Sequence, residues 1–205
     1  MTEATIVVAT FGQRKWVELA ERRALPSAAK FGLPVVHEHG ATLHDARNAG
    51  LAKVDTKWVC FLDADDELEP GYFEAMSGAA ADVRVPAVRY VRPNGLSRQP
   101  PGIPQVAGHH HLCDAECLPY GNWIVIGAVA KTELVRQVGG FRDWSCIEDW
   151  DLWARCYQAG ASFARCPDAV YRAHVRPDSR NRLARGTRML ETHREIASEL
   201  GFPVP

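Results

Sequence analysis

The densest group of potentially reactive side chains directly follows an apolar run at residues 57–62. Six acidic residues and no Lys or Arg occur between Asp63 and Glu74. Carboxylates two residues apart, such as Asp63 and Asp65, can converge on one divalent cation where a strand turns, and Mg²⁺ and Mn²⁺ prefer such oxygen ligands. The alternative is a solvated turn in which an acid caps the helix that we expect near Pro70. The segment therefore predicts either a cation site or a helix cap.

A second acidic cluster follows a tight turn at Gly139 and Gly140, which glycine permits more readily than other residues. Glu148, Asp149 and Asp151 then open an amphipathic helix. Acids in a first helical turn also compensate the helix dipole, and this alternative stays open for Glu148 and Asp151. Asp149 has tryptophans nearby in the chain that suggest an apolar cleft, where a carboxylate could act as a general base toward a hydroxyl.

Four of the six tryptophans lie in the second half of the chain, and they include Trp123 and Trp150. Aromatic side chains offer broad amphipathic surfaces, which suit the apolar faces of sugar rings. We therefore expect Trp123 and Trp150 to bind an acceptor.

Helical and strand-like patterns alternate along the chain, which predicts an α/β fold with a mostly parallel, doubly wound sheet. In such sheets ligands bind at the carboxyl ends of the strands, where the first acidic cluster would lie. Strands are expected at residues 5–9, 33–37, 57–62, 83–91, 123–130 and 169–174. Helices are expected at residues 13–24 (ended or kinked by Pro26), 43–53, 70–80, 132–138, 148–159 and 179–200.

Five prolines between Pro86 and Pro104 predict an irregular connection. We expect it to divide one domain into two halves, residues 1–104 and residues 105–205. A length of 205 residues suits a single domain of this kind.

Composition excludes several classes of protein. The 24 basic and 25 acidic residues give a net charge of −1, which offers no general attraction to nucleic acid. No apolar stretch reaches the roughly 20 residues that a membrane helix requires, and no signal peptide is recognisable. We therefore expect a cytoplasmic protein without an integral membrane segment, whose six cysteines stay reduced.

Other patterns are weaker. The Gly-rich phosphate loops of dinucleotide-binding proteins and P-loop NTPases are absent. The three histidines at 109–111, with Cys113 and Cys117, could bind zinc, but a loop near the acceptor is the preferred interpretation. Six arginines lie between Arg172 and Arg188; those nearest His174 could neutralise a diphosphate, or they could form a solvated face.

Five segments in order resemble the family 2 glycosyltransferases, which have the GT-A fold, a Rossmann-like α/β/α sandwich with a mostly parallel central sheet. The resemblance spans about residues 5 to 175. The segments are Thr10-Phe11-Gly12, the ARNAGL sequence at 46–51, the LDADD sequence at 62–66 (a DxD element), the VGGFR sequence at 138–142 and the Glu148-Asp149 pair.

The resemblance implies a nucleotide-sugar donor, bound by the first half of the chain, while the second half would bind the acceptor. It implies that Asp65, with Asp63 and His174 nearby, holds a divalent cation, Mn²⁺ or Mg²⁺. Asp149, paired with Glu148, would be the catalytic base. Donor contacts are implied for residues at the strand ends and on the first helices: Thr10, Phe11, Glu38, Arg47, Asp63, Ala64, Asp65 and Arg172.

Two positions depart from the family pattern. The segment after the second expected strand has Glu38 where the family usually has an Asp that reads the base, and Gly12 replaces the usual Asn. Glu38 could still accept a hydrogen bond from a uracil or guanine N–H.

The expected activity is metal-dependent, inverting transfer of a sugar from a UDP-, GDP- or dTDP-linked donor to a hydroxyl of a sugar, lipid or protein acceptor. The alternatives are a sugar-nucleotidyltransferase and a non-catalytic glycan-binding module of the same fold. A nucleic-acid partner is not expected, and a homodimer is possible.

Overall fold

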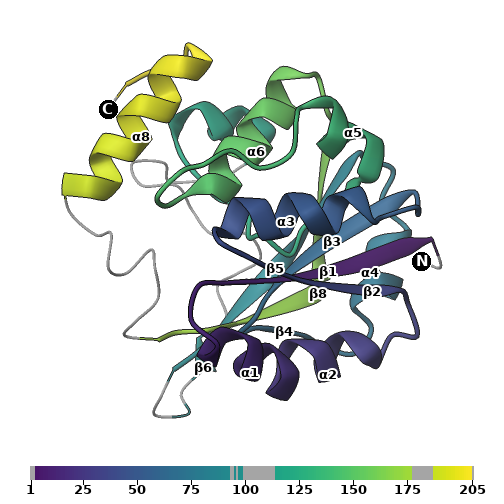
Figure 1. Cartoon of the computed structure of the whole chain (residues 1–205). Coiled ribbons are helices and arrows are strands. Elements are labelled where there is room, and N and C mark those ends of the chain that lie inside the picture. Colours follow the sequence, from purple (N-terminus) through teal and green to yellow (C-terminus); the bar gives the residue numbers. More distant parts are fainter. Residues whose placement is uncertain (1–2, 93–94, 96, 99–113, 177–186, 205) are drawn as a thin grey trace.

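The computed structural model describes residues 3–92, 95, 97–98, 114–176 and 187–204. These residues form a central sheet with helices on both sides: Figure 1 shows α3, α5 and α6 on one side and α1 and α2 on the other. The sheet order is β2-β1-β3-β7-β5-β8-β4, and β6 pairs with β5. The strands are β1 (Ala4–Phe11), β2 (Val35–Gly40), β3 (Trp58–Asp63), β4 (Glu67–Leu68), β5 (Val83–Val91), β6 (Ser97–Arg98), β7 (Val129–Lys131) and β8 (Phe163–His174).

The longer strands run in one direction. β1 pairs in parallel with β2 and β3, and β5 pairs in parallel with β8, whereas the short β4, β6 and β7 are antiparallel to their neighbours. Because β7 is antiparallel to both β3 and β5, these two long strands also point the same way. The mostly parallel α/β fold is confirmed, and both halves of the chain contribute strands to this one sheet.

The helices are α1 (Lys15–Arg22), α2 (Ala24–Ala29), α3 (Leu43–Ala52), α4 (Tyr72–Ser77), α5 (Thr132–Gln137), α6 (Glu148–Gln158) and α8 (Thr187–Leu200), with a 3-10 turn, η1, at Ala115–Tyr120. Within the ranges that the structure describes, no helix is long and apolar enough to cross a membrane. The segment of histidines and cysteines at 109–117, for which a loop was preferred to a zinc site, and the start of the last expected helix lie mostly outside the described residues; Cys117 is described and is buried.

The parallel strands bring distant segments to one edge of the sheet. Ala9 on β1 is opposite Asp63 on β3, and Phe11 is opposite Gly40 on β2. β5 and β8 end at Val91 and His174, which are also register partners. The acidic segment therefore begins at the carboxyl edge of the sheet, as the sequence predicted.

Some expected elements differ from the structure in extent or continuity. The strand expected at residues 169–174 begins at Phe163 in β8, and the helix expected at residues 70–80 is limited to α4. The helix expected at residues 13–24 is two helices separated at Arg23, and Pro26 lies in the first turn of α2, where its missing N–H is tolerated. The strand expected at residues 123–130 is reduced to β7, because residues 123–128 follow an irregular buried path. Apolar character reports burial and does not distinguish a buried strand from a buried turn.

Gly127, in that irregular segment, allows close packing behind the acidic turn. Its carbonyl accepts hydrogen bonds from the Tyr72 hydroxyl at 2.7 Å and from the Cys60 thiol at 3.2 Å. A Cβ at this position would lie 2.1 Å from Cδ2 of Tyr171, a fully buried ring. Only a residue without a side chain fits this space.

We expect Gly127→Ala to lower the free energy of unfolding by about 1–3 kcal/mol, because the added methyl overpacks a rigid site. Urea unfolding measures the change. Gly78→Ala is the matched control: Gly78 has a right-handed helical backbone (φ −78°) and open space at its Cβ, so it should be neutral or slightly stabilising. Equal stability of the two variants would contradict the packing argument.

Candidate active site

Arg47 joins three distant segments at the carboxyl edge of the sheet. Its guanidinium, almost fully buried, donates to Oδ1 of Asp63 at 2.7 Å and to Oε1 of Glu148 at 2.6 Å, and it lies 4.9 Å from the centre of the Phe141 ring. Burial alone would lower the pKa of Arg47, but the two carboxylates raise it above its ordinary value. The arginine therefore stays charged and fixes the start of α6 against the end of β3.

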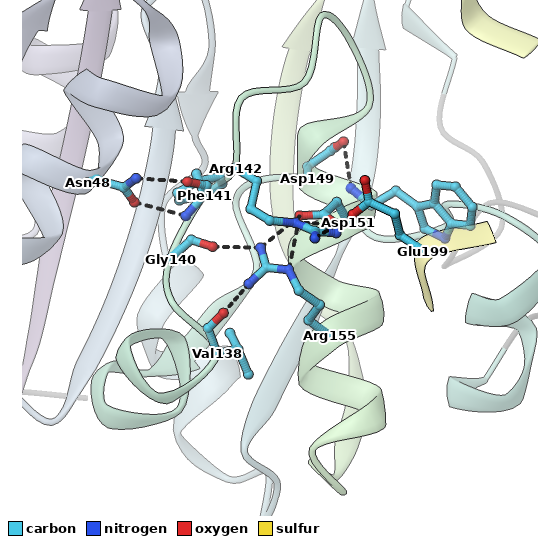
Figure 2. A network of polar contacts seen from close by, with 10 residues as sticks. Asn48, Val138, Gly140, Phe141, Arg142, Asp149, Asp151, Arg155 and Glu199 are labelled. Atoms are coloured by element: carbon cyan, nitrogen blue, oxygen red, sulfur yellow. Dashed lines mark hydrogen bonds and ion pairs between the residues drawn. The ribbon is translucent and has the colours of Figure 1, made fainter. Parts of the chain in front are cut away.

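Helix α3 carries Arg47 and a second connection to the glycine turn. Thr42 caps the helix by accepting a hydrogen bond from the backbone N–H of Asp45. One turn later the Asn48 amide donates to the carbonyl of Phe141 and accepts from its N–H, both at 2.8 Å (Figure 2). Two side chains of the ARNAGL segment thus hold the turn before α6 and the first residue of α6.

The acidic turn, residues 63–66 at the end of β3, holds three aspartates and buries Ala64. Asp66 is buried and accepts from the Tyr171 hydroxyl at 2.8 Å and from the His174 N–H at 2.7 Å. Burial, reinforced by the charge of Asp63, raises the pKa of Asp65 to about 6. Burial and the charge of Asp65 raise the pKa of Asp66 well above its ordinary range. The turn therefore crowds carboxyl groups together, and their raised pKa values indicate that its surroundings only partly compensate the negative charge of their ionised forms.

Two arginines approach Asp65 from other elements. Arg23, at the break between α1 and α2, donates to the Asp65 carbonyl at 2.7 Å. Nε of Arg176 lies 3.8 Å from Oδ2 of Asp65, and its guanidinium lies 5.4 Å from the centre of the Trp16 ring. The sequence indicated the arginines that follow His174 but not Arg23, whose position at a helix break carries no motif.

Asp149 lies in the first turn of α6, one residue beyond the Arg47 contact. Its Oδ1 accepts a hydrogen bond from the N–H of Trp150 at 2.9 Å. Burial and the neighbouring Glu148 carboxylate raise the pKa of Asp149 to about 7. Ile147, just before it, has a left-handed backbone (φ 51°), which in the described residues occurs elsewhere only at glycines. Strain of this kind often accompanies functional sites.

His174 and Arg172 are engaged with glutamates of β4 and its flank. Nε2 of His174 is 2.8 Å from Oε2 of Glu67, and Arg172 lies 3.7 Å from Glu67 and 3.6 Å from Glu69. Among the described residues no three His, Cys, Asp or Glu side chains are grouped as a metal cage. The carboxylates of Asp63 and Asp65 still fit Mg²⁺ or Mn²⁺, which proteins often bind through one or two carboxylates together with substrate phosphates.

Glu38, which the sequence predicts to contact the donor, lies near the end of β2 beside a lysine. Oε1 of Glu38 lies 2.5 Å from Nζ of Lys53 on the α3 side of the sheet, so its carboxylate is already paired. The Thr10 hydroxyl instead lies 3.2 Å from Nε2 of His37 and 3.1 Å from Nδ1 of His39. The two histidines flank the end of β1, next to Phe11, and sequence reasoning did not select them.

The two tryptophans expected to bind an acceptor are buried. Trp123 is 3% exposed and Trp150 is 0% exposed, and Nε1 of Trp150 donates to the Leu118 carbonyl at 2.8 Å. This placement differs from the open apolar cleft that the sequence suggested, because tryptophans next to acids in the chain pack into the core. Their contact with an acceptor stays a prediction. In the structure Trp150 packs in the core and connects α6 to residue 118.

Comparison with known proteins places this geometry in a family. The model of glycosyl transferase family 2 matches residues 17–109. The pre-mycofactocin glycosyltransferase of Mycobacterium tuberculosis, from strains CDC 1551 / Oshkosh and ATCC 25618 / H37Rv, is 31% identical over 160 residues, or 73% of this chain. The chain belongs to glycosyl transferase family 2. The family match includes the ARNAGL segment and the acidic turn, the two segments that Arg47 connects.

Solved structures show the same GT-A fold. S. aureus TarS 1-349 in complex with UDP-GlcNAc aligns with a TM-score of 0.59 at 15% identity, covering 97% of this chain and 66% of TarS 1-349. The UDP complex gives a TM-score of 0.56 at 16% identity, with 97% and 65% covered. The chain spans about a third of the length of the mycobacterial relatives.

We expect Arg47→Leu to lower the free energy of unfolding by about 3–5 kcal/mol, since it leaves the buried Glu148 and the half-buried Asp63 facing each other without a cation. Arg14→Ala is the control, because Arg14 lies 3.6 Å from Glu18 in an exposed pair whose loss should cost less than about 1 kcal/mol. Urea unfolding at pH 7 compares them. A similarly small effect at both positions would contradict the bridging role of Arg47.

Proposed function

We propose that this chain transfers a sugar from a nucleoside-diphosphate donor to an acceptor hydroxyl, with inversion at the anomeric carbon. The observation that carries the proposal is the pairing of the two acidic clusters through Arg47. The pairing brings the start of α6, where Asp149 would be the base, next to the end of β3, where Asp63 and Asp65 would hold a cation. Membership of glycosyl transferase family 2 supports transfer over nucleotidyl chemistry.

Asp149 suits the role of base. Its pKa of about 7 lets the carboxylate be ionised at neutral pH while remaining basic enough to take a proton from a hydroxyl. Glu148 is held by Arg47 and serves to place Asp149 and to raise its pKa. A single base and a single displacement invert the configuration, by the same logic that applies to inverting glycosidases.

The donor would bind at the carboxyl edge of the sheet. Asp65 and Asp63 are the residues that would hold Mn²⁺ or Mg²⁺, and the cation would stabilise charge on the departing diphosphate. Arg23 and Arg176, both close to Asp65, supply positive charge at the same place. TarS, which shares the fold, was crystallised with UDP-GlcNAc and with UDP, and this supports a uridine nucleotide as the first donor to test.

Asp149→Asn should abolish transfer and leave nucleotide binding largely intact, because the amide keeps the shape but cannot accept the proton. In the wild type, kcat should rise with pH through about 7 and level off above it, since the ionised carboxylate is the active form. Turnover with UDP-, GDP- and dTDP-sugars measures the loss of transfer and the pH dependence of kcat, and thermal unfolding with the nucleotide measures binding. Retained turnover in Asp149→Asn would remove this residue from the mechanism.

Donor and metal can be identified together by thermal unfolding. We expect one class of nucleotide-sugar to raise the melting temperature in the presence of Mn²⁺, by about 5–11 °C near a hundredfold excess over Kd, and EDTA to remove most of this shift. Asp65→Asn should lose the metal-dependent part only.

A shift that does not depend on metal with any nucleotide would contradict the cation site. A donor shift without turnover on any acceptor would favour the non-catalytic glycan-binding alternative.

A further inference from the structure

The C-terminal helix α8 contacts the helix that carries Asp149 through an aromatic stack. The rings of Trp150 on α6 and His193 on α8 lie parallel, with centroids 4.2 Å apart and an interplanar angle of 6°. Trp150 is fully buried, and His193 covers one of its faces. The position and tilt of the Trp150 ring are therefore set partly from outside α6.

Both stacked rings are also tied to the same short turn. Nε1 of Trp150 donates to the Leu118 carbonyl of η1, and His193 hydrogen-bonds the backbone of Tyr120 at the end of that turn. Nδ1 of His193 is buried and has no hydrogen-bond partner in the described part of the chain. The stack therefore joins α6 to α8, and both of its rings are anchored to η1.

Polar contacts around the stack hold α8 and α6 together. Arg142 pairs with Asp151, one turn into α6, and with Glu199 of α8 at 2.8 Å (Figure 2). The Gln158 amide donates to the Leu200 carbonyl at 2.5 Å. These contacts position the helices, whereas the stack is the contact made at the residue next to Asp149.

We propose that His193 is a positioning residue for Asp149: its ring fixes Trp150, whose backbone N–H holds the Asp149 carboxylate. This inference rests on the proposed role of Asp149 as base. The hydrogen bond from Trp150 joins adjacent residues in the first turn of α6, just after the strained Ile147. Movement of the Trp150 ring therefore moves the main chain that aims the carboxylate.

The expected kinetic signature is selective. Small misplacements of a reacting group lower the rate of the chemical step, by up to about 100-fold for an error near 1 Å. Donor binding uses the ends of β1 and β3, which His193 does not contact. Loss of the stack should therefore lower kcat and leave the KM for the donor unchanged.

The experiment compares variants of the whole chain. His193→Ala should lower kcat about 10- to 100-fold with the donor KM within about twofold. His193→Phe, which keeps a flat ring on Trp150, should recover kcat to within about threefold of wild type. Glu195→Ala, at an exposed position of the same helix, should leave kcat unchanged.

A purely structural effect is separated by Ile196→Val, which loosens a buried contact of α8 without touching the stack. If this variant lowers kcat as much as His193→Ala at an equal loss of melting temperature, the positioning role is overturned. A value of kcat in His193→Ala within twofold of wild type would overturn it as well.

A readout without turnover distinguishes this inference from the proposed function. Hydrogen–deuterium exchange at residues 148–152 should speed up in His193→Ala and not in His193→Phe. Unchanged exchange in His193→Ala overturns the inference even if Asp149 proves to be the base. Turnover retained in Asp149→Asn overturns the base assignment whatever the exchange shows.

Discussion

The site depends on one buried cation. Arg47 lies between Asp63 at the end of β3 and Glu148 at the start of α6, and its guanidinium is the positive charge placed between these two carboxylates. Buried charges are tolerated when each is paired and hydrogen-bonded. Removing the arginine would leave two carboxylates that repel each other where water solvates them poorly. The helix that carries Asp149 can therefore approach the acidic turn only while Arg47 is present. The same contacts of Arg47 therefore hold α3 against the end of β3 and fix the position of the start of α6.

The acidic turn stays crowded with carboxyl groups even with Arg47 in place. Asp65 and Asp66 both have raised pKa values, caused first by burial and then by neighbouring carboxylates, although Arg23 and Arg176 approach Asp65. A divalent cation relieves such crowding more effectively than another arginine, because it brings two charges into a small volume. The nearly neutral overall charge of the chain conceals this local imbalance, which suits a small anionic substrate bound together with a cation.

The parts of the site that are contiguous in the chain could be predicted from the sequence. The end of β3, the ARNAGL helix and the Glu148-Asp149 pair were each recognisable as short segments, and parallel topology predicted that strand ends meet at one edge. What could not be predicted depends on which face a side chain occupies and on partners far along the chain. Glu38 is paired with Lys53, Trp150 is covered by His193, and Arg172 lies beside Glu67 and Glu69. No local pattern encodes these pairings, because register and helix packing determine them.

Burial of Asp149 also lowers the stability of the folded state when this carboxyl is ionised. A carboxyl whose folded pKa is about 7 and whose ordinary value is 3.8 favours the folded state in its protonated form. This stabilising contribution is complete below about pH 4 and is lost as the pH rises through about 7, where the ionised form of Asp149 appears. The next helical turn is anchored by Asp151, fully buried between Arg142 and Arg155, while Arg155 also donates to the carbonyls of Val138 and Gly140. The charged form of Asp149 therefore lies at the start of a helix whose next turn is held by Asp151, a buried carboxylate that two arginines neutralise.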